Sequence, residues 1–197
     1  MDNDKELAER SIEIANLRQS EFIASVPKEL CDREDVIRKK LSRENASNRS
    51  KLRKVYNLVN ELMEYSKPFT ACDRGCSSCC NINVMISQVE ADLIGERIGH
   101  KPITLREPKN HEIGYFNGTP CPFLKNDSCS IYENRPYVCR QHVCFDESSY
   151  WCDPIRTHKM NEMPLLRFSE AEAAMLDIGK LEHGGVFADI RDFFPRG

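Results

Sequence analysis

The segment CDRGCSSCC, residues 72–80, places four cysteines within nine residues. Thiolates are soft ligands that hold zinc and iron–sulfur clusters, and each such centre needs ligands that converge on one point. Cys76 and Cys79 have the C-x2-C spacing, in which one tight turn directs two sulfurs to the same place. With Cys72 they form C-x3-C-x2-C, a spacing that also holds three irons of a four-iron cluster. The chemistry that this segment indicates is therefore metal binding through sulfur.

A second group of cysteines lies downstream in CPFLKNDSCSIYENRPYVCRQHVC, residues 121–144. Its members are Cys121, Cys129, Cys139 and Cys144. Two groups of four cysteines suffice for two closed sites, or for one cluster and a second site. Because neighbouring side chains point apart, Cys79 and Cys80 either serve different sites or include one spare. We expect ligands from both groups to interleave and to hold the middle of the chain together.

The metal is either zinc or an iron–sulfur cluster, since thiolate-only sites suit both. The C-x3-C-x2-C spacing favours a cluster, whereas the even number of cysteines favours two zinc ions. Zinc is slightly favoured for the purified protein, because clusters are often lost in air and zinc can then occupy the thiolates. Either centre carries negative charge, and Arg74, Arg135 and Arg140 lie within the two motifs, where they could donate to sulfur or balance that charge.

The two motifs together resemble those of the bacterial YkgJ-type cysteine-cluster family, a zinc- or iron-chelating domain. The shared elements are C-x3-C-x2-C-C, then C-P-F-L, a second cysteine before I-Y, and R-P-x-x-C-R. The resemblance implies eight metal ligands, which are Cys72, Cys76, Cys79, Cys80, Cys121, Cys129, Cys139 and Cys144. A bacterial flagellin lysine methylase has a similar cysteine pattern. The alternative is therefore an iron–sulfur enzyme, such as a protein lysine N-methyltransferase or a redox protein.

Several residues outside the matched pattern carry weaker signals. We expect Cys31 to be a buried thiol on a helix. Cys152, beside Trp151, is an alternative ligand, and His142, three residues after Cys139, could replace a sulfur. The remaining histidines have no ligand spacing and are expected at the surface or in structural roles; they are His100, His111, His158 and His183.

Other function classes find less support in the sequence. The stretch from Arg33 to Lys54 has nine basic and three acidic residues and could bind nucleic acid. No aromatic platform accompanies it, however, and helices commonly expose such charges to water. The sequence contains no G-x-S-x-G, P-loop or dinucleotide fingerprint. It also lacks the alternating strands of a β/α barrel, in which an open cluster could support radical chemistry.

The compartment decides how the cysteines are interpreted. The N-terminal sequence MDNDKELAER lacks the basic and apolar parts of a secretory signal. No apolar run approaches the roughly 18 residues needed to cross a bilayer. We therefore expect a cytoplasmic protein with a metal ion, and no membrane, as its partner; the sequence specifies no protein partner. Thiols stay reduced in the cytosol, which favours metal ligands over a disulfide framework or buried free thiols.

The composition predicts a mainly α protein with a small, irregular, cysteine-rich metal-binding core that contains short β pieces. We expect a helical N-terminal region at 1–66, a cysteine-cluster metal-binding domain at 67–152, and a helical C-terminal segment at 153–197 that packs on the core. Residues 1–66 contain one proline and no glycine, which is typical of helices.

Local signals divide this plan into elements. The first helix is expected at 3–24, and the next helical region, 28–66, contains a polar run at 42–50 that either divides it or leaves its middle exposed. Ser87 with Glu90, and Ser169 with Glu172, have the spacing of capping boxes. The KNDS sequence predicts a turn between two extended pieces. Further helices are expected at 87–99, after Pro136, at 169–181 and, from its apolar spacing, at 186–194.

Overall fold

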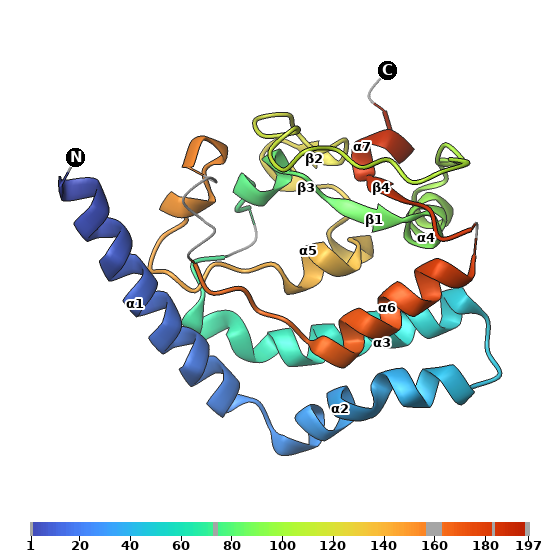
Figure 1. Ribbon diagram of the computed structural model, residues 1–197, viewed down its shortest axis with the longest axis horizontal. Coiled ribbons are helices and arrows are strands. Elements are labelled where there is room, and N and C mark those ends of the chain that lie inside the picture. Colours follow the sequence, from blue (N-terminus) through green and yellow to red (C-terminus); the bar gives the residue numbers. More distant parts are fainter. Residues whose placement is uncertain (1, 73–74, 157–162, 183, 196–197) are drawn as a thin grey trace.

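The computed structural model describes residues 2–72, 75–156, 163–182 and 184–195. The protein is mainly helical, and the strands within these described residues form two short two-stranded sheets, so the predicted fold class is confirmed. Figure 1 shows α5 (Tyr137–Gln141) between a layer of long helices and the strands, with α1 (Asp2–Ser25) along one side of the molecule.

The N-terminal third forms three helices, α1 (Asp2–Ser25), α2 (Lys28–Arg43) and α3 (Asn48–Met63). The polar run at 42–50 does divide the second helical region. The chain leaves α2 at Arg43, and the Ser47 hydroxyl accepts a hydrogen bond from the Ser50 N–H at 3.3 Å at the start of α3. A short 3-10 helix, η1 (Glu64–Phe69), follows α3 and leads into the first cysteine segment.

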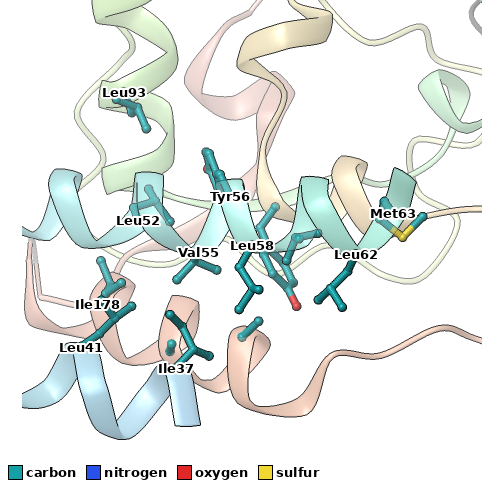
Figure 2. Packing of buried hydrophobic residues seen from close by; sticks show 14 of the residues in the cluster. Ile37, Leu41, Leu52, Val55, Tyr56, Leu58, Leu62, Met63, Leu93 and Ile178 are labelled. Carbon is teal, nitrogen blue, oxygen red and sulfur yellow. The ribbon is translucent and has the colours of Figure 1, made fainter. Parts of the chain in front are cut away.

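A hydrophobic cluster joins α2 and α3 to α6 (Ser169–Leu181) (Figure 2). The buried residues of α3 recur every three or four positions, as expected for one face of a helix; they are Leu52, Val55, Tyr56, Leu58, Val59, Leu62 and Met63. Ile37 and Leu41 of α2 and Ile178 of α6 pack in the same cluster. The last long helix therefore shares a core with the N-terminal helices.

The start of α6 differs from the prediction. Ser169 is already the first helical residue, so the expected capping box with Glu172 does not form at this helix start. Instead the carboxylate of Glu34, from α2, accepts hydrogen bonds from the N–H groups of Glu170 and Ala171 at 2.8 and 3.0 Å. A cap from a neighbouring helix satisfies the free N–H groups that a local serine would otherwise bind.

The second half of the protein begins with β1 (Met85–Ser87) and α4 (Gln88–Ile98). Here the predicted capping box is present: the Ser87 hydroxyl accepts from the Glu90 N–H, and the Glu90 carboxylate accepts from the Ser87 N–H. The helix ends at Gly99, whose φ of 67° is the left-handed conformation that glycine adopts readily.

The C-terminal tail is not the single helix that its apolar spacing predicts. Residues Phe187–Asp189 form β4, which pairs antiparallel with β1 and places Ile86 opposite Ala188. Only Ile190–Phe193 form a helix, α7. Pairing with β1 satisfies backbone N–H and C=O groups of this segment, and its side chains, including Ala188 and Ile190, are buried in a hydrophobic cluster. Pairing with β1 therefore decides the secondary structure of residues 187–189, although the spacing of the apolar residues is helical.

Between these elements lies the cysteine-rich part of the chain. The KNDS turn is confirmed: β2 (Leu124–Lys125) and β3 (Ser128–Cys129) form a hairpin, and Asn126 and Asp127 both have positive φ, as a tight hairpin turn requires. The helix expected after Pro136 is α5 (Tyr137–Gln141). Further 3-10 turns lie along the path, among them η2 (Ser78–Asn81), η3 (Tyr132–Asn134) and η4 (Tyr150–Cys152).

A buried carboxylate connects α5 to the long helices. Glu90 accepts hydrogen bonds from the Tyr56 hydroxyl at 2.8 Å and from the Tyr137 N–H at 2.9 Å, in addition to its bonds with Ser87. Burial and the neighbouring Glu90 raise the pKa of the Tyr56 hydroxyl well above its usual value. The N-terminus of α5 is thereby tied to both α3 and α4.

Candidate metal centre

The two cysteine segments meet through their backbones. The Cys121 N–H donates to the Cys80 carbonyl at 2.7 Å, and the Gly118 N–H donates to the Asn81 carbonyl at 2.8 Å. These bonds place the end of η2 beside the chain that enters the β2–β3 hairpin. Cys129 lies at the end of that hairpin and Cys139 on α5, so short elements bring sulfurs from both segments to one region.

Seven of the eight predicted ligands line one cavity of about 1000 Å³. These cysteines are Cys72, Cys76, Cys79, Cys80, Cys121, Cys129 and Cys139. The cavity wall also contains polar side chains, including Asn60, Tyr132, Arg135, Arg140 and His142. Cys144, the eighth, is buried next to Cys72. That these residues bind a metal stays a prediction, but their gathering is a property of the fold.

The sulfurs of Cys80, Cys121, Cys129 and Cys139 influence one another. Burial, and after it the nearby Cys80, raises the pKa of Cys121 to about 11. Burial also raises the pKa of Cys139, with further contributions from the other three. A hydrogen bond to Cys79 raises the pKa of Cys80. Without a cation these neighbouring thiols therefore keep their protons at neutral pH.

A second set of contacts surrounds Cys144. Its N–H donates to the Cys72 sulfur at 3.2 Å, and its carbonyl accepts from the Ala71 N–H at 2.8 Å. The thiol of Cys152 donates a hydrogen bond to the Cys144 sulfur, which lowers the pKa of Cys144 and raises that of Cys152. Burial raises the pKa of Cys72 to about 11. Cys152 thus belongs to this neighbourhood although neither motif contains it.

All ten cysteines are free thiols. Cys31 lies on α2 as expected, but it is exposed rather than buried. The buried face of α2 contains Leu30, Ile37 and Leu41, and the residue after Leu30 points about 100° away from that face. Within the described parts of the chain, no group of three or more His, Cys, Asp or Glu side chains is arranged as it would be around a bound metal ion.

Arginine side chains lie beside both sets of sulfurs. The positive charge of Arg135 acts on Cys72, Cys129 and Cys139, and that of Arg191 acts on Cys80 and Cys121. Among the described residues, nothing accepts a hydrogen bond from the buried Nε atoms of Arg135, Arg140 and Arg191. Arg74, which the motif also suggested, lies outside the described residues.

Arg191 is a residue that the sequence motifs did not indicate. Its guanidinium binds the buried Asp189 carboxylate at 2.9 Å and donates to the carbonyls of Cys80 at 3.2 Å and Thr119 at 2.5 Å. Asp189 also accepts from the Val84 N–H at 2.7 Å. The pair fixes the backbone on both sides of the meeting point of the two cysteine segments. Asp189 lies in β4 and Arg191 in α7. Both elements are distant in sequence from the cysteine segments, and only the fold brings them together.

The histidines differ in their surroundings. His142 lines the cavity, and burial lowers its pKa, which keeps the ring neutral. His111 lies 2.8 Å from the Asp192 carboxylate and stacks on Tyr115, so it has a structural role, and His100 packs near Phe194. His158 and His183 lie outside the described residues.

Five of the nine basic residues between Arg33 and Lys54 form ion pairs, four of them with carboxylates of other elements. Arg33 pairs with Glu61 at 2.6 Å, and Arg38 pairs with Asp177 at 2.8 Å. Arg49 and Arg53 pair with Glu96, and Lys54 with Glu44. These side chains connect α2, α3, α4 and α6, so the geometry favours a role in helix packing over a free face for nucleic acid.

The helices of the described residues offer no segment with the length and apolar character of a membrane span. Taken together, the fold and site define a helical protein with a partly open, cysteine-lined cavity that suits soft metal ions. Residues 71–159 match the CxxCxxCC family model, described as "Putative zinc- or iron-chelating domain". The YkgJ-type label of the sequence resemblance fits this family. Comparisons with curated proteins and with solved structures gave no match.

Proposed function

We propose that this protein binds zinc or iron through thiolates that two distant segments of the chain contribute, and that the bound metal stabilises the cysteine-rich part of the fold. The proposed ligands come from Cys72, Cys76, Cys79, Cys80, Cys121, Cys129, Cys139 and Cys144. The observation that supports it best is the lining of a single cavity by seven of these cysteines. Buried thiols without a cation pack only as small hydrophobes, which gives no reason for seven of them to share one cavity wall.

The donor set fits either metal. Thiolates suit zinc and iron–sulfur clusters equally. The pKa values of Cys121 and Cys139 are raised because these thiols are buried and close to other cysteines, and a bound cation would compensate the charge that their deprotonation creates. Arg135 and Arg191 add positive charge beside the sulfurs. The elements that carry the cysteines are very short, so a metal that joins them would contribute directly to folding. Zinc is slightly favoured as the metal of the purified protein.

An iron–sulfur enzyme or redox protein is the second candidate, because polar side chains line the cavity together with the cysteines. Its volume of about 1000 Å³ is at the upper end of the range for small-molecule pockets. Asn60, Tyr132 and Arg135 present hydrogen-bonding groups to the same space. A closed site with four sulfurs would support a structural metal, whereas an open coordination position facing these side chains would support catalysis.

The direct test is purification of the full chain without oxygen, followed by elemental analysis, assay of acid-labile sulfide and a visible spectrum. About two zinc ions per chain and no colour would support structural zinc, while a brown protein with about four irons and sulfide would indicate a cluster. Cys139→Ser should lower the metal content, and Cys31→Ser, at an exposed thiol outside both motifs, should not. Wild-type protein that takes up neither metal would refute the proposal.

A further inference from the structure

Resting on the proposed metal binding, we propose that Cys152, which lies outside both motifs, is a metal ligand in this chain. It completes a set of four sulfurs with Cys72, Cys76 and Cys144. The remaining set is then Cys80, Cys121, Cys129 and Cys139, and Cys79 is not required in either. This assignment differs from the eight ligands that the family resemblance implies, because Cys152 takes a place that the resemblance gives to Cys79.

The first observation is the direct contact among three members of the proposed set. The Cys152 thiol is hydrogen-bonded to the Cys144 sulfur. The Cys144 N–H donates to the sulfur of Cys72 at 3.2 Å. This bond fixes the position of the Cys72 sulfur beside residue 144. Cys76 lies within electrostatic range of both Cys72 and Cys152.

The second observation is that the local fold holds Cys152 in place. Its side chain is 5% exposed and follows the buried Trp151 in η4. The Cys152 N–H donates to the Ser149 carbonyl at 2.9 Å, which closes the 3-10 turn. The Cys144 thiol approaches the carbonyl of Ser148 at 3.5 Å. The loop between the two cysteines thus folds back and brings residue 152 against residue 144.

The third observation is that Cys139 and Cys152 have different cysteines as their electrostatic neighbours. Cys139 interacts with Cys121, Cys80 and Cys129, whereas Cys152 interacts with Cys144, Cys72 and Cys76. Cys79 contacts its neighbour Cys80. Adjacent residues cannot easily direct both sulfurs to one ion, because their side chains diverge, so Cys80 can serve the first set without Cys79.

The arrangement of positive charge agrees with two centres. Arg191 lies beside Cys80 and Cys121 of one set. Arg18, from α1, donates to the Asp146 carbonyl at 2.7 Å and places its charge near Cys144 of the other set. Arg135 acts on Cys72 of one set and on Cys139 of the other. Each proposed four-thiolate centre therefore has its own arginine, and one arginine lies between them.

The test compares Cys152→Ser, Cys79→Ser and the exposed-site control Cys31→Ser in the full chain, each reconstituted with zinc and desalted. We expect about two zinc ions per chain in the wild type, in Cys79→Ser and in the control, and about one in Cys152→Ser. A second variant, Cys152→His, distinguishes ligation from packing, because imidazole also binds zinc. It should restore the second ion and change the average ligation seen by X-ray absorption from sulfur only to sulfur with nitrogen.

Two zinc ions in Cys152→Ser, with one lost in Cys79→Ser, would overturn the assignment and leave the proposed metal binding intact. Loss of zinc from Cys152→His, with the same loss in Cys152→Ser, would also overturn it, because packing rather than ligation would then explain the effect. No zinc in the wild type would refute the proposed function itself, and the assignment with it.

Discussion

Replacing Arg191 with methionine should destabilise the fold at the point where the two cysteine segments meet. The Arg191 side chain is 7% exposed and its partner Asp189 is 1% exposed. Removal of one member of such a buried pair typically costs about 3–5 kcal/mol, because the other charge is left without compensation. Asp189 keeps bonds from the N–H groups of Val84 and residue 191, which places the expected loss near the lower value, about 3 kcal/mol.

The loss also has a local consequence. Without the guanidinium, the carbonyls of Cys80 and Thr119 lose the donor that holds them together. Each lost bond to a charged donor contributes about 1.5–3 kcal/mol in other proteins, although water can replace part of this at the edge of the cavity. Arg191→Lys keeps the charge but not the planar fork, so it should be intermediate. Methionine should therefore lower the zinc content as well as the stability.

Urea unfolding of the full chain, followed by circular dichroism, measures the change. The matched control is Arg33→Met, which removes an arginine from an ion pair whose side chain is 44% exposed; such pairs contribute about 0–1 kcal/mol. A protein of this size is typically stable by about 5–15 kcal/mol, so Arg191→Met should still fold. A loss below about 1 kcal/mol, equal to that of the control and with unchanged zinc content, would show that this pair does not hold the cysteine segments together.

Three further predictions follow from the contacts. Glu90→Gln should destabilise by about 3 kcal/mol in the same urea assay, because one amide oxygen cannot accept all four hydrogen bonds that the carboxylate receives; a neutral effect would contradict its role as the buried link. Glu34→Ala should cost about 1 kcal/mol through the lost cap of α6, and equal unfolding midpoints would refute it. In chelated protein, burial raises the pKa of Cys72 and Cys121 to about 11, above the usual value of about 8.5. Stability from these thiols is complete below about pH 8.5 and should fall as the pH rises toward 11, whereas zinc-loaded protein, already without those protons, should depend less on pH.

Two serines with the same local signal show what the sequence could and could not predict. Ser87 and Ser169 each precede a glutamate by three residues, but only Ser87 forms the capping box. The difference is the neighbour: Glu34 of α2 reaches the start of α6 and caps it. The existence of both helices was predictable from periodicity and composition, whereas the cap depended on a contact between distant parts of the chain.

The tail shows the same limit for secondary structure. Phe187, Ile190 and Phe194 have helical spacing, but residues 187–189 form a strand because β1 is available to pair with them. A helical spacing of apolar residues indicates which side chains are buried. In the tail, this burial comes from both pairing with β1 and packing against α4. Only knowledge of the partner strand could have decided between the two.

For the candidate site, cysteine type and spacing indicated the segments that line the cavity. The same reasoning could not predict Arg191, because no spacing links it to the motifs and only the β1–β4 pairing brings it to Cys80. Cys152 was recognised only as an alternative, since a lone cysteine beside Trp151 has no ligand pattern. The loop that returns it to Cys144 is visible in the fold alone.

Helix α3, which lies outside the matched residues 71–159, and helix α4, which lies within them, both connect physically to the candidate centre. Arg140, next to Cys139 on α5, donates to the Asn60 side chain of α3 at 2.9 Å and stacks over the ring of Tyr56 at 4.3 Å. Glu90 binds both that tyrosine and the first N–H of α5. Cys139 therefore lies on a helical turn that α3 and α4 hold from two sides. A short element with five residues cannot hold a ligand in place by its own backbone bonds, so the long helices act as the rigid support on which the cysteine segments can close around a metal.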